Sequence, residues 1–144
     1  MFLQANPLNS SELIFPTLEV IHIAGSAVLM GTIGILDFRL LGFGMLRQKP
    51  AELAQDLAPW TLVGLVLMLI SGPLMFSSDP DMYYLNHAFQ AKMTLLLLAI
   101  IFNYTIHRKV AMRGGSPMSE KLVAVVSILL WVGIVFGGIF IAFI

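Results

Sequence analysis

The chain has 144 residues, of which 58% are hydrophobic and 11% are charged, and its formal net charge is zero. Soluble domains carry about 25% charged residues, so this composition excludes an ordinary soluble domain and indicates an all-α integral membrane protein. A neutral chain without a basic patch gives no basis for nucleic-acid binding. The absence of cysteine excludes disulfides, thiolate metal sites and cysteine nucleophiles.

Apolar stretches of about the length that a bilayer requires recur along the chain. They predict four spanning helices, near 14–40, 58–77, 84–107 and 121–143. The residues before the first stretch lack the positive start and continuous apolar core of a secretory signal, so we expect a retained helix there. No repeat or linker divides the sequence, which predicts one four-helix bundle domain over residues 1–144.

The connections between these stretches contain local start signals for helices. Pro50 is expected to begin a short interfacial helix or turn, and Pro59 to lie in the first turn of the second span. Asp79 before Pro80 is a helix-starting pattern in the second connection. Ser119 is a candidate N-cap for the last helix.

Basic residues predict the orientation of the bundle. All but one of the eight Lys and Arg residues lie at or in the first and third connections: Arg39, Arg47, Lys49, Arg108, Lys109, Arg113 and Lys121. By the positive-inside rule these two connections face the cytoplasm, so both chain ends face outward. The exception, Lys92, lies inside the third span.

Polar side chains interrupt the first and third spans: Glu19, His22, Ser26 and Asp37 in the first, and His87, Gln90, Lys92, Asn103 and His107 in the third. A central charge costs roughly 2.5–3.5 kcal/mol on insertion scales, so these residues need partners or a function. Around an ideal helix Lys92 and Asn103 lie about 20° apart and His107 about 60° from Lys92, which makes one polar stripe. Glu19 and His22 share a face that should point into the bundle.

His22 lies about two turns inside its apolar stretch and cannot easily reach water, which predicts a functional role. Structural roles also fit the other polar residues: interfacial exposure for His87 and His107, snorkelling for Lys92, an interfacial pair for Asp37 and Arg39, and an interhelical hydrogen bond for Asn103.

Two histidines on two helices of a bundle are typical axial ligands of a b-type haem. With both chain ends outward, His22 and His87 lie in the same half of the membrane, so they are the predicted ligands of the haem iron. Lys92 or Arg39 would offset the charge of a haem propionate or a semiquinone, and Asn103 completes the predicted cofactor-binding set. This hypothesis predicts electron transfer, with a quinone or a redox protein as partner.

Three segments carry a resemblance to known proteins: IHIAGSAVLMGTIGILDFRLLG, LISGPLMF and FQAKMTLLLLAIIFN. They resemble a family of small uncharacterised bacterial four-helix membrane proteins, similar in layout to HemJ-type protoporphyrinogen oxidases and CopD-type membrane domains. The resemblance implies a bacterial inner-membrane location, a b-type haem, and functional roles for His22 and Lys92. A HemJ-type histidine late in helix three is Asn103 here, with His107 one turn later, which favours cofactor binding and electron transfer over porphyrinogen oxidation.

Two other functions remain open at this stage. The thioether and imidazole groups of Met75, Met82 and His87 near the outward loop suit copper handling at the outer face. Alternatively, the chain is a cofactor-free accessory subunit whose helices pack in a homo-oligomer or a larger membrane complex.

Overall fold

The computed structural model of the chain describes residues 7–144, which form helices joined by short turns, with no strand in this part. In chain order the elements are the 3-10 turn η1 (Pro7–Asn9), α1 (Ile14–Leu41), α2 (Pro50–Ser78), α3 (Pro80–Tyr84), α4 (His87–Phe102), the π-helical turn η2 (Asn103–His107), α5 (Arg108–Arg113) and α6 (Pro117–Phe140). The unbroken rod His87–Arg113 combines α4, η2 and α5. This rod, α1, α2 and α6 are each long and apolar enough to cross a membrane, which confirms the predicted all-α four-helix fold.

The second span begins earlier than the sequence analysis predicted. The interfacial helix expected after Pro50 and the span expected at 58–77 are one continuous helix, with Pro50 in its first turn and Pro59 and Pro73 inside it. Proline at the first helical position loses no hydrogen bond, whereas an interior proline leaves one carbonyl without its partner. Such interior prolines are tolerated in spanning helices, where neighbouring groups or water satisfy the freed carbonyl.

The ends of the last two spans also differ from the prediction. The third rod begins at His87, where the Asn86 side chain accepts a hydrogen bond from Phe89 N at 3.1 Å, and it continues past residue 107. The cap of α6 is Ser116, whose Oγ accepts from Ser119 N at 3.2 Å, so the predicted cap at Ser119 is wrong. Ser116 precedes a proline, which holds its backbone extended as an N-cap requires.

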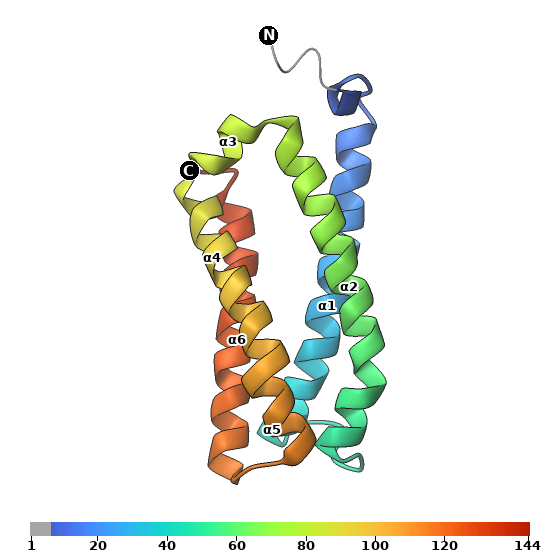
Figure 1. Cartoon of the computed structure of the whole chain (residues 1–144), viewed down its shortest axis with the longest axis vertical. Helices are drawn as coiled ribbons and strands as arrows, with labels where there is room; N and C mark the ends of the chain where they lie inside the picture. Colours follow the sequence, from blue (N-terminus) through green and yellow to red (C-terminus); the bar gives the residue numbers. More distant parts are fainter. Residues whose placement is uncertain (1–6) are drawn as a thin grey trace.

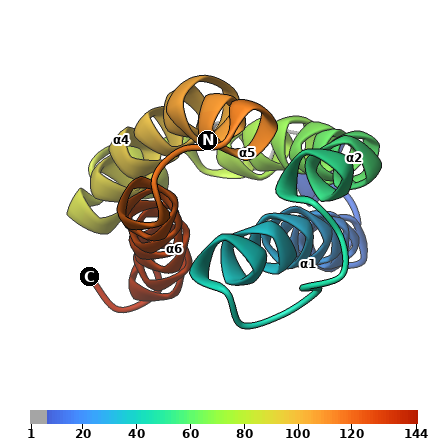
Figure 2. The ribbon, with the colours of Figure 1, turned by 90° about the horizontal axis from the view of Figure 1, so that it is seen from below.

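The rods form two helical pairs, α1 with α2 and α4–α5 with α6 (Figure 1). We call the end with the α1–α2 and α5–α6 connections the basic end, and the opposite end, where the chain leaves α6, the α3 end. Viewed along the bundle, α1 lies between α2 and α6, and α5 lies beside α2 (Figure 2). The two pairs meet at the basic end and diverge toward the α3 end (Figure 1).

The apolar core occupies the middle of the rods and continues to the basic end. Its largest cluster takes two residues from each rod: Leu29, Ile33, Leu65, Met68, Leu96, Ala99, Trp131 and Ile134. Two smaller clusters, built around Leu36 and Leu40, follow it along α1. The core therefore holds the pairs together in the middle and at the basic end.

Glycines set the closest contact in the bundle, between α1 and α2. A Cβ atom added to Gly64 would lie 2.6 Å from Leu29 N and 2.8 Å from Gly25 O, closer than real Cβ atoms approach. Gly31 on α1 has no atom within 4 Å of such a Cβ. The two backbones can therefore touch only because residue 64 has no side chain.

We expect Gly64→Ala to lower the stability of the protein by about 1–3 kcal/mol, the usual cost of overpacking. The measurement is the thermal unfolding midpoint in detergent, with Gly31→Ala as the matched control. The control should keep its unfolding midpoint, because its added methyl group meets no other atom and alanine favours a helix over glycine. Equal midpoints for the two variants would contradict a close contact at Gly64.

Candidate functional site

His22 on α1 is half-buried and contacts Ser71 on α2. The distance between His22 Nδ1 and Ser71 Oγ is 2.8 Å, and Ser71 Oγ also donates to Leu67 O at 2.6 Å. Because a serine hydroxyl has one proton, Ser71 uses it on Leu67 O and accepts from His22 Nδ1–H. This network leaves the lone pair of His22 Nε2 uncommitted, as in a histidine whose second nitrogen binds a metal.

Two neighbours shape the surroundings of the His22 ring. A Cβ atom on Gly72 would lie 3.5 Å from His22 Cε1, so the glycine brings the α2 backbone close to the ring. Ser26, four residues after His22 on α1, donates its hydroxyl proton to His22 O at 2.7 Å. The edge of the ring at Nδ1 is therefore fixed by α2, whereas Ser26 only bonds the backbone of its own helix.

Lys92 on α4 is half-buried and lies against two glycines of α6. A Cβ atom on Gly137 would be 3.0 Å from Lys92 Cβ, and one on Gly138 would be 3.3 Å from Lys92 Nζ. In the part of the chain that the structure describes, no carboxylate lies within 4.0 Å of this amine. Lys92 therefore packs against α6 of its own helical pair, whereas His22 packs against α2 of the other pair.

The other predicted cofactor residues lie elsewhere. His87 is exposed at the first position of α4, and no contact between it and His22 is described. Arg39 donates from Nε to Gln48 O at 2.8 Å at the basic end, about 25 Å along α1 from His22. Asn103 begins the π-helical turn, also toward the basic end. His87 as the second ligand stays a prediction, and a single haem beside His22 would not reach Arg39.

Aromatic rings close the α3 end. Tyr83 of α3 lies with Phe76 of α2 and Phe89 of α4, at ring-centroid distances of 5.6–6.1 Å. Burial raises the pKa of the Tyr83 phenol above its ordinary value, and the carboxylates of Asp79 and Glu19 raise it further. The phenol therefore keeps its proton at neutral pH and can donate a hydrogen bond.

A second polar centre, which we call the Asp37 cluster, consists of Asp37, His107 and Ser127. The distance from His107 Nε2 to Asp37 Oδ1 is 2.6 Å, and Ser127 Oγ donates to Asp37 Oδ2 at 2.7 Å. The exposed fractions are 1% for Asp37, 2% for His107 and 1% for Ser127. The cluster joins α1, η2 and α6 near the basic end, and both carboxylate oxygens have a partner.

The Asp37 cluster corrects two structural interpretations of the sequence. The interfacial pair of Asp37 and Arg39 does not form, because Asp37 bonds His107 and Ser127 while Arg39 bonds a backbone carbonyl. His107 is not exposed at the interface but buried. The available signal was the position of Asp37 inside an apolar run, where an acid requires a partner. Nothing in the sequence identified that partner.

His107 also borders a small cavity of about 40 Å³ between α1, α2 and the third rod. Polar groups in its wall come from Thr32, Thr61, Asn103 and Arg108. The hydroxyls of Thr32 and Thr61 lie 2.8 Å apart. A water molecule needs only about 10–15 Å³ of such volume and two to four polar partners, so the cavity can hold water.

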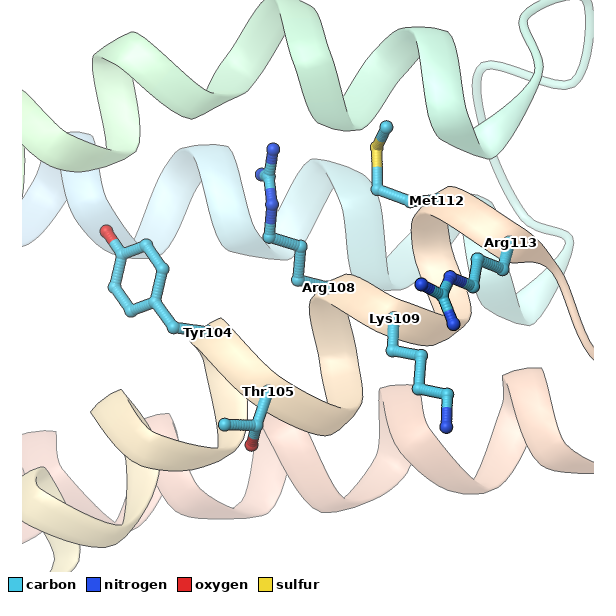
Figure 3. Close-up of a pocket in the computed structure, with 6 residues that line it drawn as sticks. All are labelled: Tyr104, Thr105, Arg108, Lys109, Met112 and Arg113. Carbon is cyan, nitrogen blue, oxygen red and sulfur yellow. The ribbon is translucent and has the colours of Figure 1, made fainter.

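The outer surface of η2 and α5 carries an open groove of about 390 Å³ (Figure 3). Its lining is largely basic: Tyr104, Thr105, Arg108, Lys109, Met112 and Arg113. Figure 3 shows Tyr104 and Arg108 directed toward α2 and Lys109 toward α6. Tyr104 and Arg108 also line the cavity beside His107, so the cavity and the basic groove adjoin.

These observations define a multi-pass, four-helix membrane protein with polar groups between its helical pairs. The chain belongs to DUF6644, a family of unknown function, whose pattern matches residues 13–144. No curated protein and no solved structure matches the chain. Family membership confirms the predicted assignment to an uncharacterised family, while the likeness to HemJ-type and CopD-type proteins stays a prediction.

No group of three or more His, Asp or Glu side chains is arranged to hold a metal ion within residues 7–144. Haem ligation needs only two side chains, so this finding does not bear on it. Met82 and His87, from the predicted copper set, are both exposed near the α3 end, and Met75 is half-buried. Copper handling and the role of accessory subunit stay predictions.

We expect Asp37→Ala to lower the free energy of unfolding by about 3–5 kcal/mol, because it leaves His107 and Ser127 buried without their partner. The measurement is the unfolding midpoint in mixed detergent micelles. Asp56→Ala, which removes an exposed carboxylate from α2, is the control and should change little. A loss of similar size in both variants would contradict a specific role for the buried pair.

Proposed function

We propose that this protein binds a b-type haem between α1 and α4, in the α3 half of the bundle, and takes part in electron transfer. The main support is the orientation of the His22 ring. Because Ser71 donates its proton to Leu67 O, it accepts from His22 Nδ1–H, and the lone pair of Nε2 stays free. A hydrogen bond on the second ring nitrogen is typical of metal-binding histidines and raises their basicity.

The position and charge of Lys92 support the same proposal. Its amine has no carboxylate within 4.0 Å in the described part of the chain, and its side chain packs closely over Gly137 and Gly138. An unpaired cation in a spanning helix is costly without an anion. A haem propionate is an anion of suitable chemistry, and His22, in the same α3 half of the bundle, would supply the iron ligand. Lys92 is therefore preferred over the distant Arg39 for this role.

The residues of this site would bind and orient the group, and the haem iron would supply one-electron chemistry. His22 would hold the iron from α1, and Ser71 would fix the tautomer and plane of its ring. The apolar faces of the helical pairs would exclude water. A membrane quinone or a redox protein would deliver or receive the electron.

The first test is an absorption spectrum of detergent-purified protein expressed with ample haem, oxidised in air and then reduced with dithionite. We expect a Soret band that sharpens on reduction, with α and β bands, and its loss in His22→Gln. In His87→Gln the band should persist and shift to that of five-coordinate iron, if the predicted second ligand is correct. A folded but colourless wild-type protein would overturn the proposal and favour the accessory-subunit function.

Ser71→Ala separates the proposed role of the ring hydrogen bond from simple packing. We expect it to weaken haem binding by about 10–100-fold, the usual effect of losing the partner of a metal-bound histidine. Haem titration followed by the Soret absorbance gives the affinity. Ser26→Ala is the matched control and should leave the haem affinity unchanged, since Ser26 bonds only a backbone carbonyl of its own helix. Unchanged affinity in Ser71→Ala would refute the assigned tautomer.

A further inference from the structure

The Asp37 cluster has no part in the proposed haem site. It lies fifteen residues from His22 along α1, which corresponds to about 22 Å. In the described part of the chain, its histidine and aspartate are the only basic and acidic side chains within 4.0 Å of each other. Ionisable residues buried in spanning helices commonly mark proton pathways, so the cluster requires an explanation of its own.

Each oxygen of the Asp37 side chain has a partner: the Ser127 hydroxyl donates to Oδ2, and Oδ1 lies 2.6 Å from His107 Nε2. With Asp37 as a carboxylate, His107 Nε2–H is the second donor. A neutral imidazole with its proton on Nε2 gives the buried group a net charge of −1. Burying an uncompensated charge is costly, and a second proton on the ring would remove it. Since Nε2 is committed to Asp37, Nδ1 is the nitrogen that can receive this proton.

The cavity beside His107 offers a route for that proton. Its walls carry the hydroxyls of Thr32 and Thr61 and the amide of Asn103, and its residues Tyr104 and Arg108 also belong to the basic groove. Water in this cavity would connect the ring with the basic end, which the charge distribution predicts to be cytoplasmic. The direction of access is therefore from the basic end.

In the opposite direction the bundle is closed. The largest apolar cluster, with residues from all four rods, lies between the Asp37 cluster and the His22 site. Its members include Leu29 and Ile33 of α1, which follow His22 and precede Asp37 in the helix. Apolar packing of this kind excludes the water that a continuous proton path would need.

The charged and titratable neighbours of His107 are few. Asp37 faces it from α1, while Tyr104 and Arg108 of its own rod border the cavity. From α2 the cavity wall receives Thr61 and apolar side chains, and from α6 the cluster receives the hydroxyl of Ser127. Among residues 7–144, Asp37 is thus the only acid in contact with the ring.

We propose that the Asp37 cluster is a proton-binding site that exchanges protons with the cytoplasmic side only, through the cavity lined by Thr61. A proton leaves a cavity water, its O–H bond breaking as a bond to His107 Nδ1 forms. The Nε2 proton stays shared with Asp37, and the product is a neutral imidazolium–carboxylate pair. No electron moves, and the hydroxide left in the cavity is neutralised from the bulk solvent.

The π-helical turn positions the ring for this role. η2 ends at His107, and a π-helical turn accommodates one more residue than an α-helical turn, which changes the direction of the side chains around it. Such turns are frequent at functional sites. Here the turn places His107 between Asp37 and the cavity, where one ring can contact both.

The test uses the full chain in lipid nanodiscs with ¹⁵N-labelled histidine, because only three histidines are present. Spectra of His22→Gln and His87→Gln assign the remaining signal to His107. We expect the ¹⁵N signals of His107 to report reversible gain and loss of a proton at Nδ1 when the pH of the buffer is changed. Its ring proton should also exchange with deuterium while the protein stays folded. A signal that neither responds to pH nor exchanges would overturn the proposal and show that the Asp37 cluster only joins the helices by hydrogen bonds.

Two variants test the partner and the route. Asp37→Asn should weaken binding of the added proton to His107 by about tenfold or more, because it removes the carboxylate that neutralises the imidazolium. Thr61→Val keeps the shape of the cavity wall but removes a hydroxyl, and it should slow deuterium exchange at His107. The matched control is Thr94→Val on α4, an exposed threonine that lines neither the cavity nor the basic groove and whose hydroxyl bonds Gln90 O. Equal exchange rates in the two valine variants would refute the proposed route, even if Asp37→Asn fails to fold.

The result does not depend on the haem, since the readout is the protonation of His107 in the protein as purified. A colourless protein in which His107 titrates would refute the proposed function and support the proton site. A protein that binds haem but in which His107 neither responds to pH nor exchanges would support the proposed function and refute the proton site.

Discussion

The carboxylate of Asp37 is the constraint on which the arrangement of the rods depends. A charged oxygen inside a spanning helix has no lipid partner, so each of its acceptor positions must be satisfied by the protein. His107 and Ser127 supply the two donors, and they come from two different rods. Satisfying one side chain therefore fixes how α1, η2 and α6 meet. The close contact between Gly64 and α1 then positions α2, the remaining rod.

This constraint acts at the basic end, and the contacts at the other end are of a different kind. There α3 joins the helical pairs through the rings of Phe76, Tyr83 and Phe89, and Asn86 Nδ2 donates to Ile141 O at 2.9 Å. The pairs diverge toward this end (Figure 1). His22 and Lys92 thus lie on different pairs in this half of the bundle, His22 packed against α2 and Lys92 against α6. A bundle fixed at one end can place a cofactor site at the other without losing its fold.

The sequence predicted the fold well, because length and apolarity alone identify spanning segments. It predicted helix ends less well, because several start signals lie close together in the connections. The second span begins at Pro50 rather than near residue 58, and Ser116 rather than Ser119 caps the last helix. Helical periodicity placed Lys92, Asn103 and His107 on one stripe but could not say which rod each residue faces. The Asp37–His107 contact spans 70 positions in the chain and passes through a π-helical turn, neither of which a helical pattern encodes. His22 was identifiable from the sequence because a polar ring deep in an apolar stretch is costly. Ser71 was not, because a serine is common in spanning helices and its role depends on its contact with His22.

The separation of the two polar centres decides how they can influence each other. Unit charges about 22 Å apart interact by roughly 0.7 kcal/mol at an effective dielectric constant of about 20, which is close to the thermal energy. An electron at a haem on His22 and a proton on His107 would therefore affect one another only weakly through charge. Any stronger coupling would have to pass through α1, which carries both residues and packs against α2 and α6. α1 is thus the helix that carries a residue of both polar centres, while the electric field between them is weak.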